Sequence, residues 1–238
     1  MPLAWTFPLP RPHTGIPLSN GTQGLLIWGE GCELRITVSR LGFWDRRGGN
    51  PFLSKTTFTE VRRLLENGDE EGLRQVFGQN DAHDAPTRPH QVGGGRLQLR
   101  FPETCTLQNA ELDLDRGEAV IHLLQAGQPH QLRVRMAVRQ ELSWLTFSAD
   151  CPQPEIHLLP SWHWTGEALA SVGCAPPRTW ADDRELGFVQ TLPEDPPLAI
   201  LASRNSGRIV LATHVGDNAE TAARQLLGED LTAQAAAA

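Results

Sequence analysis

The chain has 238 residues, of which 39% are hydrophobic and 21% are charged, and its formal net charge at pH 7 is −7. These values are ordinary for a globular protein and exclude a disordered or fibrous chain. No segment approaches the roughly 20 apolar residues that a membrane-spanning helix needs. An acidic chain without a basic cluster also argues against nucleic acid as a partner.

The chain begins with a proline-rich, extended segment that ends at Pro17. Its first fourteen residues contain no continuous apolar region, so they do not resemble a signal peptide. We therefore expect a cytoplasmic protein, or a periplasmic or secreted one if a leader has been removed. The four cysteines, which form neither a CxxC pair nor a zinc spacing, predict buried free thiols, with one disulfide as the alternative. They are Cys32, Cys105, Cys151 and Cys174.

A β-hairpin follows the first glycine-bounded loop. Leu25–Trp28 and Glu33–Arg40 are separated by a short reversal at Glu30-Gly31, and the second run alternates apolar with polar residues. This period of two predicts strands with one buried face. Glycine-bounded loops, at Gly15–Gly24 and Phe43–Gly49, flank the hairpin, which is typical of the edge of a binding site.

Two short helices are predicted as an insertion near residues 57–77. Thr57 and Glu60 form a capping box, Asn67-Gly68 ends the first helix, and Asp69 begins a second that runs to Phe77. Residues 78–95 are predicted to form a loop, which ends in three consecutive glycines.

Regular strands follow, separated by short polar turns, and they predict an antiparallel β-sandwich over residues 1–216. The predicted strands are Leu97–Phe101, Cys105–Leu114, Ala119–Leu124, Gln131–Val138, Leu142–Ser148, Gly187–Thr191, Leu198–Ser203 and Arg208–Thr213. Residues 217–238 predict an alanine-rich helix without a partner. We interpret it as the start of a linker towards a missing helical domain.

Common catalytic patterns are absent from the sequence. Neither a nucleophile elbow, a P-loop nor a dinucleotide fingerprint occurs. Nothing selects an acid–base pair for glycoside hydrolysis from the available carboxylates, and the one possible metal cluster fits no closed site. These carboxylates are Asp81, Asp84, Asp182, Asp183 and Glu185, and the possible metal cluster is His83, Asp84 and His90. We predict no catalytic residue, no metal and no cofactor in this chain.

The run Trp162-His163-Trp164 is another candidate for a functional surface. In an extended strand both indole rings would point to one face and the imidazole to the other. The two rings would then belong either to the core or to an exposed ridge that contacts sugar or a protein interface.

The loops beside the hairpin contain the better binding candidates. Asn20, next to Gly21, offers a donor and an acceptor, Asp45 accepts, Arg46 donates, and Trp44 supplies an apolar platform. Together these groups suit a polyol ligand. In the alternative interpretation Asn20-Gly21 only shapes a turn, and Asp45 forms a local ion pair with Arg47.

The same loops resemble the N-terminal β-sandwich of (α/α)-barrel glycoside hydrolases, closest to the α-L-fucosidase-like group, glycoside hydrolase family 95. The matching residues are Pro17-Leu18-Ser19-Asn20-Gly21-Thr22-Gln23-Gly24, where Ser19 replaces the usual glycine, and Gly42-Phe43-Trp44-Asp45. The resemblance implies a non-catalytic domain whose loops help to close a sugar pocket, while a following barrel carries the catalytic carboxylates. Its implied partners are an oligosaccharide and that barrel. The alternatives are a free-standing carbohydrate-binding module and a self-sufficient sugar epimerase-like enzyme.

Overall fold

The computed structural model describes residues 2–47, 56–78, 89–205 and 207–237, which form two compact units. The sandwich unit comprises residues 1–43 and 92–238, and the insert unit comprises residues 44–91, with the gaps just given. None of the described helices is both long and apolar enough to cross a membrane.

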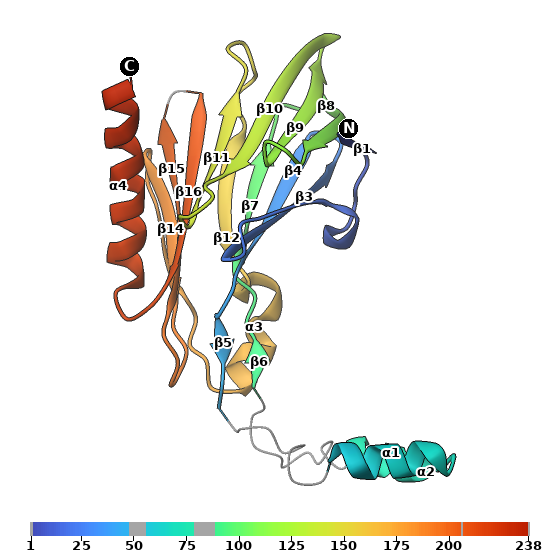
Figure 1. Cartoon of the computed structure of the whole chain (residues 1–238). Coiled ribbons are helices and arrows are strands. Elements are labelled where there is room, and N and C mark those ends of the chain that lie inside the picture. The colour runs from blue at the N-terminus through green and yellow to red at the C-terminus, as the bar shows by residue number, and fades with distance from the viewer. Residues whose placement is uncertain (1, 48–55, 79–88, 206, 238) are drawn as a thin grey trace. The chain divides into compact units, whose positions relative to one another are not determined.

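The sandwich unit is built from two antiparallel sheets, which confirms the predicted fold class (Figure 1). The nine-stranded sheet contains, in spatial order, β1 (Leu3–Thr6), β8 (Cys105–Asp113), β9 (Glu118–Gln125), β10 (Gln128–Met136), β11 (Leu142–Phe147), β16 (Arg208–Val215), β15 (Leu198–Asn205), β14 (Glu185–Gln190) and β13 (Arg178–Ala181). The five-stranded sheet contains β12 (Glu155–Pro160), β7 (Gly95–Arg100), β4 (Glu33–Arg40), β3 (Gln23–Glu30) and β2 (Ile16–Ser19). A single 3₁₀ turn, η1 (Pro12–Thr14), precedes β2.

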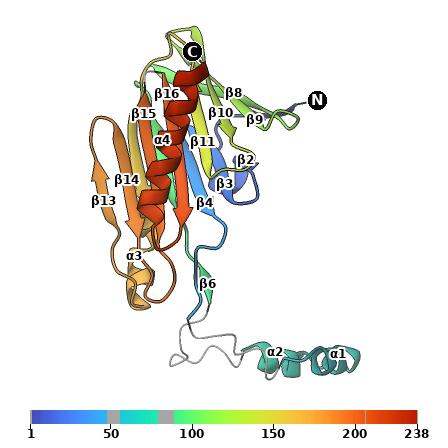
Figure 2. The same cartoon turned by 60° about the vertical axis from the view of Figure 1, so that its left-hand side comes forward.

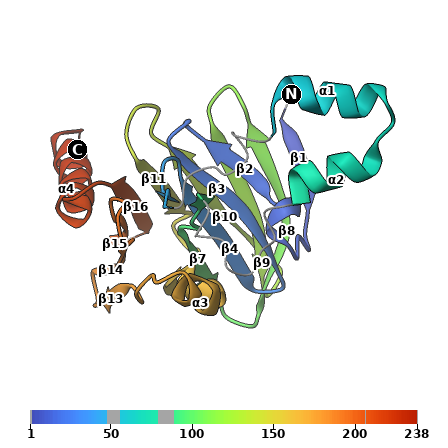
Figure 3. The same ribbon diagram turned by 90° about the horizontal axis from the view of Figure 1, so that it is seen from below.

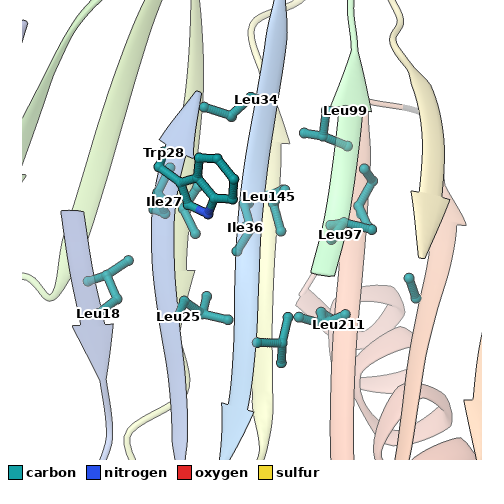
Figure 4. Close-up of a cluster of buried hydrophobic side chains, with 14 of the residues drawn as sticks. Leu18, Leu25, Ile27, Trp28, Leu34, Ile36, Leu97, Leu99, Leu145 and Leu211 are labelled. Carbon is teal, nitrogen blue, oxygen red and sulfur yellow. The ribbon is translucent and has the colours of Figure 1, made fainter. Parts of the chain in front are cut away.

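The core lies between the sheets because alternate residues of each strand face inward. Figure 3 shows β2, β3 and β4 in a layer beside β8, β9 and β10. Figure 4 shows the apolar residues of this layer, which come from both sheets. They include Leu25, Ile27, Leu34, Ile36, Leu97, Leu99, Leu145 and Leu211, each at most 2% exposed.

Close packing explains why one position of the predicted loop, residue 95, is glycine. Gly95 begins β7, so the strand starts inside the run of three glycines that was predicted to be loop. A Cβ atom at this position would lie 2.6 Å from the Leu159 carbonyl oxygen and 2.9 Å from the Phe188 ring of the other sheet. Only glycine fits this approach without displacing backbone or core.

The C-terminal helix has a partner, contrary to the prediction. Helix α4 (Ala219–Ala237) lies along the outer face of β15 and β16 (Figures 1 and 2). Its Ala219, Ala223 and Leu227 are at most 4% exposed and belong to a second apolar cluster. Small side chains let the helix approach the sheet, which is why alanine recurs on a buried helix face.

The residues around Trp162 form a helix, not the extended strand that the argument about the ring orientations assumed. Helix α3 (Trp162–Ser171) follows β12 directly. The Ser161 hydroxyl donates to the Gly93 carbonyl oxygen at 2.7 Å and thereby joins the start of the helix to the chain before β7. Because successive helical residues are about 100° apart, Trp162 and Trp164 point to different sides of α3.

The insert unit contains the two predicted helices, α1 (Phe58–Glu66) and α2 (Glu70–Gly78), and a two-stranded sheet of β5 (Trp44–Asp45) and β6 (His90–Gln91). The Thr57 hydroxyl accepts the Glu60 amide at 3.2 Å, which confirms the predicted cap. The Asp69 carboxylate accepts the Gly72 amide at 2.8 Å. Asp81, His83 and Asp84 lie outside the described residues.

Candidate functional site

Asn20 joins two loops of the sandwich unit. Its Oδ1 accepts the amides of Thr22 and Gln23 at 3.0 and 2.8 Å. Its Nδ2 donates to the carbonyl oxygens of Ala137 and Gln140 at 2.8 and 2.9 Å. The side-chain amide thus uses both donors and both acceptor positions on the protein itself. These bonds fix the β2–β3 turn against the β10–β11 connection, the kind of role that the turn interpretation gave to Asn20.

The next residue, Gly21, has φ +87°, a backbone conformation that favours glycine and shapes this turn. A depression of about 470 Å³ lies beside Asn20 and is lined in part by Leu114, Arg116 and Val138.

Asp45 is buried in an ion pair with Arg47, the arrangement given above as the alternative to ligand binding. The carboxylate is 1% exposed and receives Nε and Nη2 of Arg47 at 2.9 and 2.6 Å. The hydrogen bonds from Arg47 hold the pKa of Asp45 below its usual value, against the opposing effect of burial. Its neighbour Trp44 is 37% exposed, so of the two it offers the more accessible surface.

A polar cluster joins the two sheets at the end of the sandwich that carries the Asn20 turn. Arg40 of β4 donates from Nε and Nη2 to the Glu141 carboxylate at 2.9 and 2.7 Å. Deeper in the core, Gln23 Nε2 donates to the Thr213 hydroxyl at 3.4 Å, and both side chains are fully buried. His214 Nδ1 lies 3.5 Å from Glu141 beside a depression of about 290 Å³.

Trp162 and Trp164 differ in environment. The core position that was one interpretation of the pair describes Trp162, and the exposed position that was the other describes Trp164. Trp162 is partly buried and packs against the main core. Trp164 is 44% exposed, with the His163 ring 6.2 Å away. Around it α3 borders an open depression of about 820 Å³, which also includes Glu167 and Thr165. This surface combines a flat apolar ring with an imidazole and a carboxylate.

Side chains on the outer face of the five-stranded sheet lie next to the α3 surface around Trp164. In the sheet register Trp28 lies opposite Arg35, and Thr37 lies opposite Arg96. The Trp28 Nε1 donates to the Thr37 hydroxyl at 3.0 Å, which places the indole over β4. The guanidinium carbon of Arg35 lies 4.9 Å from the centre of the Trp28 ring.

Arg96 connects this sheet face to α3. Its guanidinium carbon lies 4.7 Å from the centre of the Trp28 ring and 4.5 Å from that of the Trp164 ring. The cation therefore lies between two aromatic faces, a stabilising arrangement. Because Arg96 covers one face of Trp164, the exposed surface of that indole belongs to its other face and its edges.

None of the clearly shifted pKa values among the described carboxyl groups is shifted in the direction that a general acid needs. The carboxyl groups with a clearly shifted pKa all have it lowered, whereas a general acid at neutral pH needs a raised one. They are Asp45, Glu60, Asp182 and Glu220. Asp182 accepts the backbone amides of Arg184 and Glu185 and so shapes a turn. Among the described residues, no group of His, Cys, Asp or Glu could hold a metal ion.

Trp28, Arg35 and Arg96 were not among the candidate site residues that the sequence suggested. The alternation of apolar and polar residues places Arg35 and Thr37 on one face of β4, and Arg96 and Gln98 on one face of β7. That pattern could have identified two polar strand faces. It could not show that they are neighbours, because the insert unit separates the two strands in sequence.

The chain matches no known protein-family model and no curated protein.

Proposed function

We propose that this chain is a non-catalytic carbohydrate-binding β-sandwich domain of a glycoside hydrolase, and that its sugar-contacting surface is centred on Trp164. The observation that carries the proposal is the exposed Trp164 ring, backed by Arg96 and bordered by His163 and Glu167.

The chemistry of that surface suits a pyranose. A flat indole covers the apolar C–H face of a sugar ring. The Glu167 carboxylate accepts hydrogen bonds from hydroxyl groups, and the His163 imidazole both donates and accepts. The stacked Arg96 holds the indole in place, so little conformational freedom is lost when a ligand stacks on its open face.

The loops around Asn20 and Trp44 have separate roles in this proposal. Asn20 and Asp45 position their loops, while Trp44 and Arg46 of the insert unit form the rival surface against which the Trp164 surface is tested. A helical barrel that follows this domain would supply the catalytic carboxylates, as the resemblance implies.

Calorimetric titration of the chain with a panel of oligosaccharides tests the proposal. We expect binding in the micromolar to millimolar range, and a loss of about tenfold or more in Trp164→Ala, since stacking contributes about 1–3 kcal/mol. Trp44→Ala is the matched control because that indole has a similar exposure, 37% against 44%.

Each outcome of this titration has a distinct meaning. Loss in Trp164→Ala with retention in Trp44→Ala supports the proposed surface. The reverse result would move the site to the insert unit, and failure of every glycan to bind would overturn the carbohydrate function itself.

One observation favours a second candidate, the epimerase-like enzyme. His214 and Glu141 lie 3.5 Å apart beside one depression, the pairing of imidazole and carboxylate that such an enzyme needs. The bidentate bond from Arg40 already engages Glu141, which weakens it as a base. Turnover of free aldoses that His214→Ala abolishes would favour this candidate over the binding domain.

A further inference from the structure

Arg96 differs from the other arginine beside Trp28 in its hydrogen bonding. Arg35 donates to Glu33 at 2.6 Å and lies 3.8 Å from Glu30, so its charge is balanced. Within the described part of the chain, Arg96 has neither a hydrogen-bond acceptor nor a carboxylate partner. Its Nε is buried without a partner, whereas the residue as a whole is partly exposed.

The surroundings of Arg96 leave its positive charge uncompensated. The nearest acid on this sheet face, Glu33, is engaged by Arg35 and by Gln98 Nε2. In the register its neighbours across the sheet are Thr37 and Leu159, both uncharged. Burial, together with the charge of Arg35, lowers the pKa of Arg96. A partly buried cation in this position is stabilised by an incoming anion.

We propose that Arg96 recognises a carboxylate, and that the glycan bound at Trp164 is therefore acidic, a uronate-containing oligosaccharide. This inference rests on the proposed function. One sugar unit stacks on the open face of Trp164, and the carboxylate of a neighbouring unit reaches the Arg96 fork at the edge of the indole. A guanidinium fixed between two rings is already oriented for two parallel bonds to a carboxylate.

Glu167 favours one orientation of such a ligand. It borders the same depression as Trp164 but belongs to α3, whereas Arg96 belongs to β7. Repulsion between like charges keeps the uronate carboxylate away from Glu167, which remains free to accept sugar hydroxyl groups. The acidic group of the glycan therefore faces the sheet rather than the helix.

Paired titrations with uronate tetramers and their methyl esters test this proposal. The ester keeps the sugar, the linkage and the length but removes the charge, and the panel contains galacturonate, mannuronate and guluronate tetramers. We expect at least one acid to bind about tenfold more tightly than its ester, the size of effect typical of a charge-assisted pair. Added salt should reduce that preference.

Two variants on β7 test whether the preference for the acid depends on Arg96. Arg96→Gln should abolish the preference for the acid, whereas the loss of the guanidinium stacked on Trp164 should weaken binding of acid and ester by the same factor. Arg100→Gln removes the same charge from an exposed position on the same face of β7 and should leave the preference unchanged. If both variants lost the preference for the acid equally, the acid would be attracted to positive charge in general. That result would overturn the role of Arg96.

The remaining outcomes separate this inference from the proposed function. Binding of acid and ester with equal affinity, abolished by Trp164→Ala, would leave the carbohydrate site standing and overturn the preference for uronates. Arg96→Lys distinguishes recognition of the carboxylate from a purely structural role of Arg96, because lysine keeps the charge but lacks the planar fork. It should retain part of the preference, and complete loss of binding to both forms would overturn the recognition role.

Discussion

Arg40 and Glu141 form a bidentate ion pair that joins the two sheets of the sandwich. One partner belongs to β4 and the other to the connection between β10 and β11. The Thr213 amide donates to the Glu141 carbonyl oxygen at 3.0 Å, so the same residue is also fixed through its backbone.

Removing one partner of this pair should destabilise the sandwich. The two side chains are only 14% and 16% exposed, so Glu141→Gln leaves a poorly solvated guanidinium without its carboxylate. We expect a loss of about 1–3 kcal/mol in the free energy of unfolding, measured in urea at pH 7. Arg116→Gln, which breaks a pair that is 71% and 39% exposed, should cost at most about 0.5 kcal/mol. Equal costs for the two variants would contradict the structural role of Glu141.

Asn20 should act on stability rather than on glycan affinity. Asn20→Ala removes four hydrogen bonds that hold two loops together. We expect a loss of about 1–3 kcal/mol in unfolding free energy and a glycan affinity that stays within about twofold. Asn20→Asp should be destabilised too, because it places a carboxylate oxygen against two carbonyl oxygens. Normal stability combined with lost affinity would restore the ligand role that the sequence predicted.

The pKa of the Asp45 carboxyl should lie below its ordinary value, because Arg47 stabilises the ionised form. In the folded state the pKa lies below that in the unfolded state. The ion pair therefore stabilises the protein above the unfolded pKa, about 3.9, and this contribution is lost as the pH falls through the folded pKa. Carboxyl carbon shifts measured by NMR should show a midpoint that rises in Arg47→Gln. An unchanged midpoint in that variant would contradict the assigned cause.

The four cysteines are free thiols, and they should react at different rates. Burial raises the pKa of Cys151 to about 11, with a further contribution from Cys105. At pH 8 only about one Cys151 thiol in a thousand is then ionised, and the thiolate is the reactive form. Mass spectrometry after iodoacetamide treatment should find half-buried Cys32 modified before Cys151. Equal rates would contradict this order.

The sequence predicted most strands of the sandwich, although not β1, β2, β12 or β13, because the signals of the others are local. Alternation in Glu33–Arg40, polar turns between later strands and the Thr57 cap each depend on neighbouring residues, and the structure has all three. At Trp162-His163-Trp164 the orientations of the rings were argued for an extended strand, but the segment forms a helix. Its context explains the difference, because the chain turns at Ser161 and Trp162 packs on the core.

The candidate site was harder to predict because it depends on contacts between distant segments. Arg96 meets Trp28 and Trp164 only after β3, β4 and β7 have paired and α3 has packed beside them. At Asn20 and Asp45 the polar side chains allowed two interpretations, ligand binding or internal hydrogen bonds. The structure uses their hydrogen bonds within the protein.

The central claim is that sugar stacks on Trp164, and the most direct measurement is of the indole N–H signals in ¹H–¹⁵N NMR spectra. The chain has seven tryptophans, and Trp164→Phe and Trp44→Phe identify the two exposed candidates by the signals they remove. On titration with the best oligosaccharide of the panel, we predict that the Trp164 signal moves and saturates while the Trp44 signal stays in place. Saturation of binding with an unmoved Trp164 signal would contradict the account.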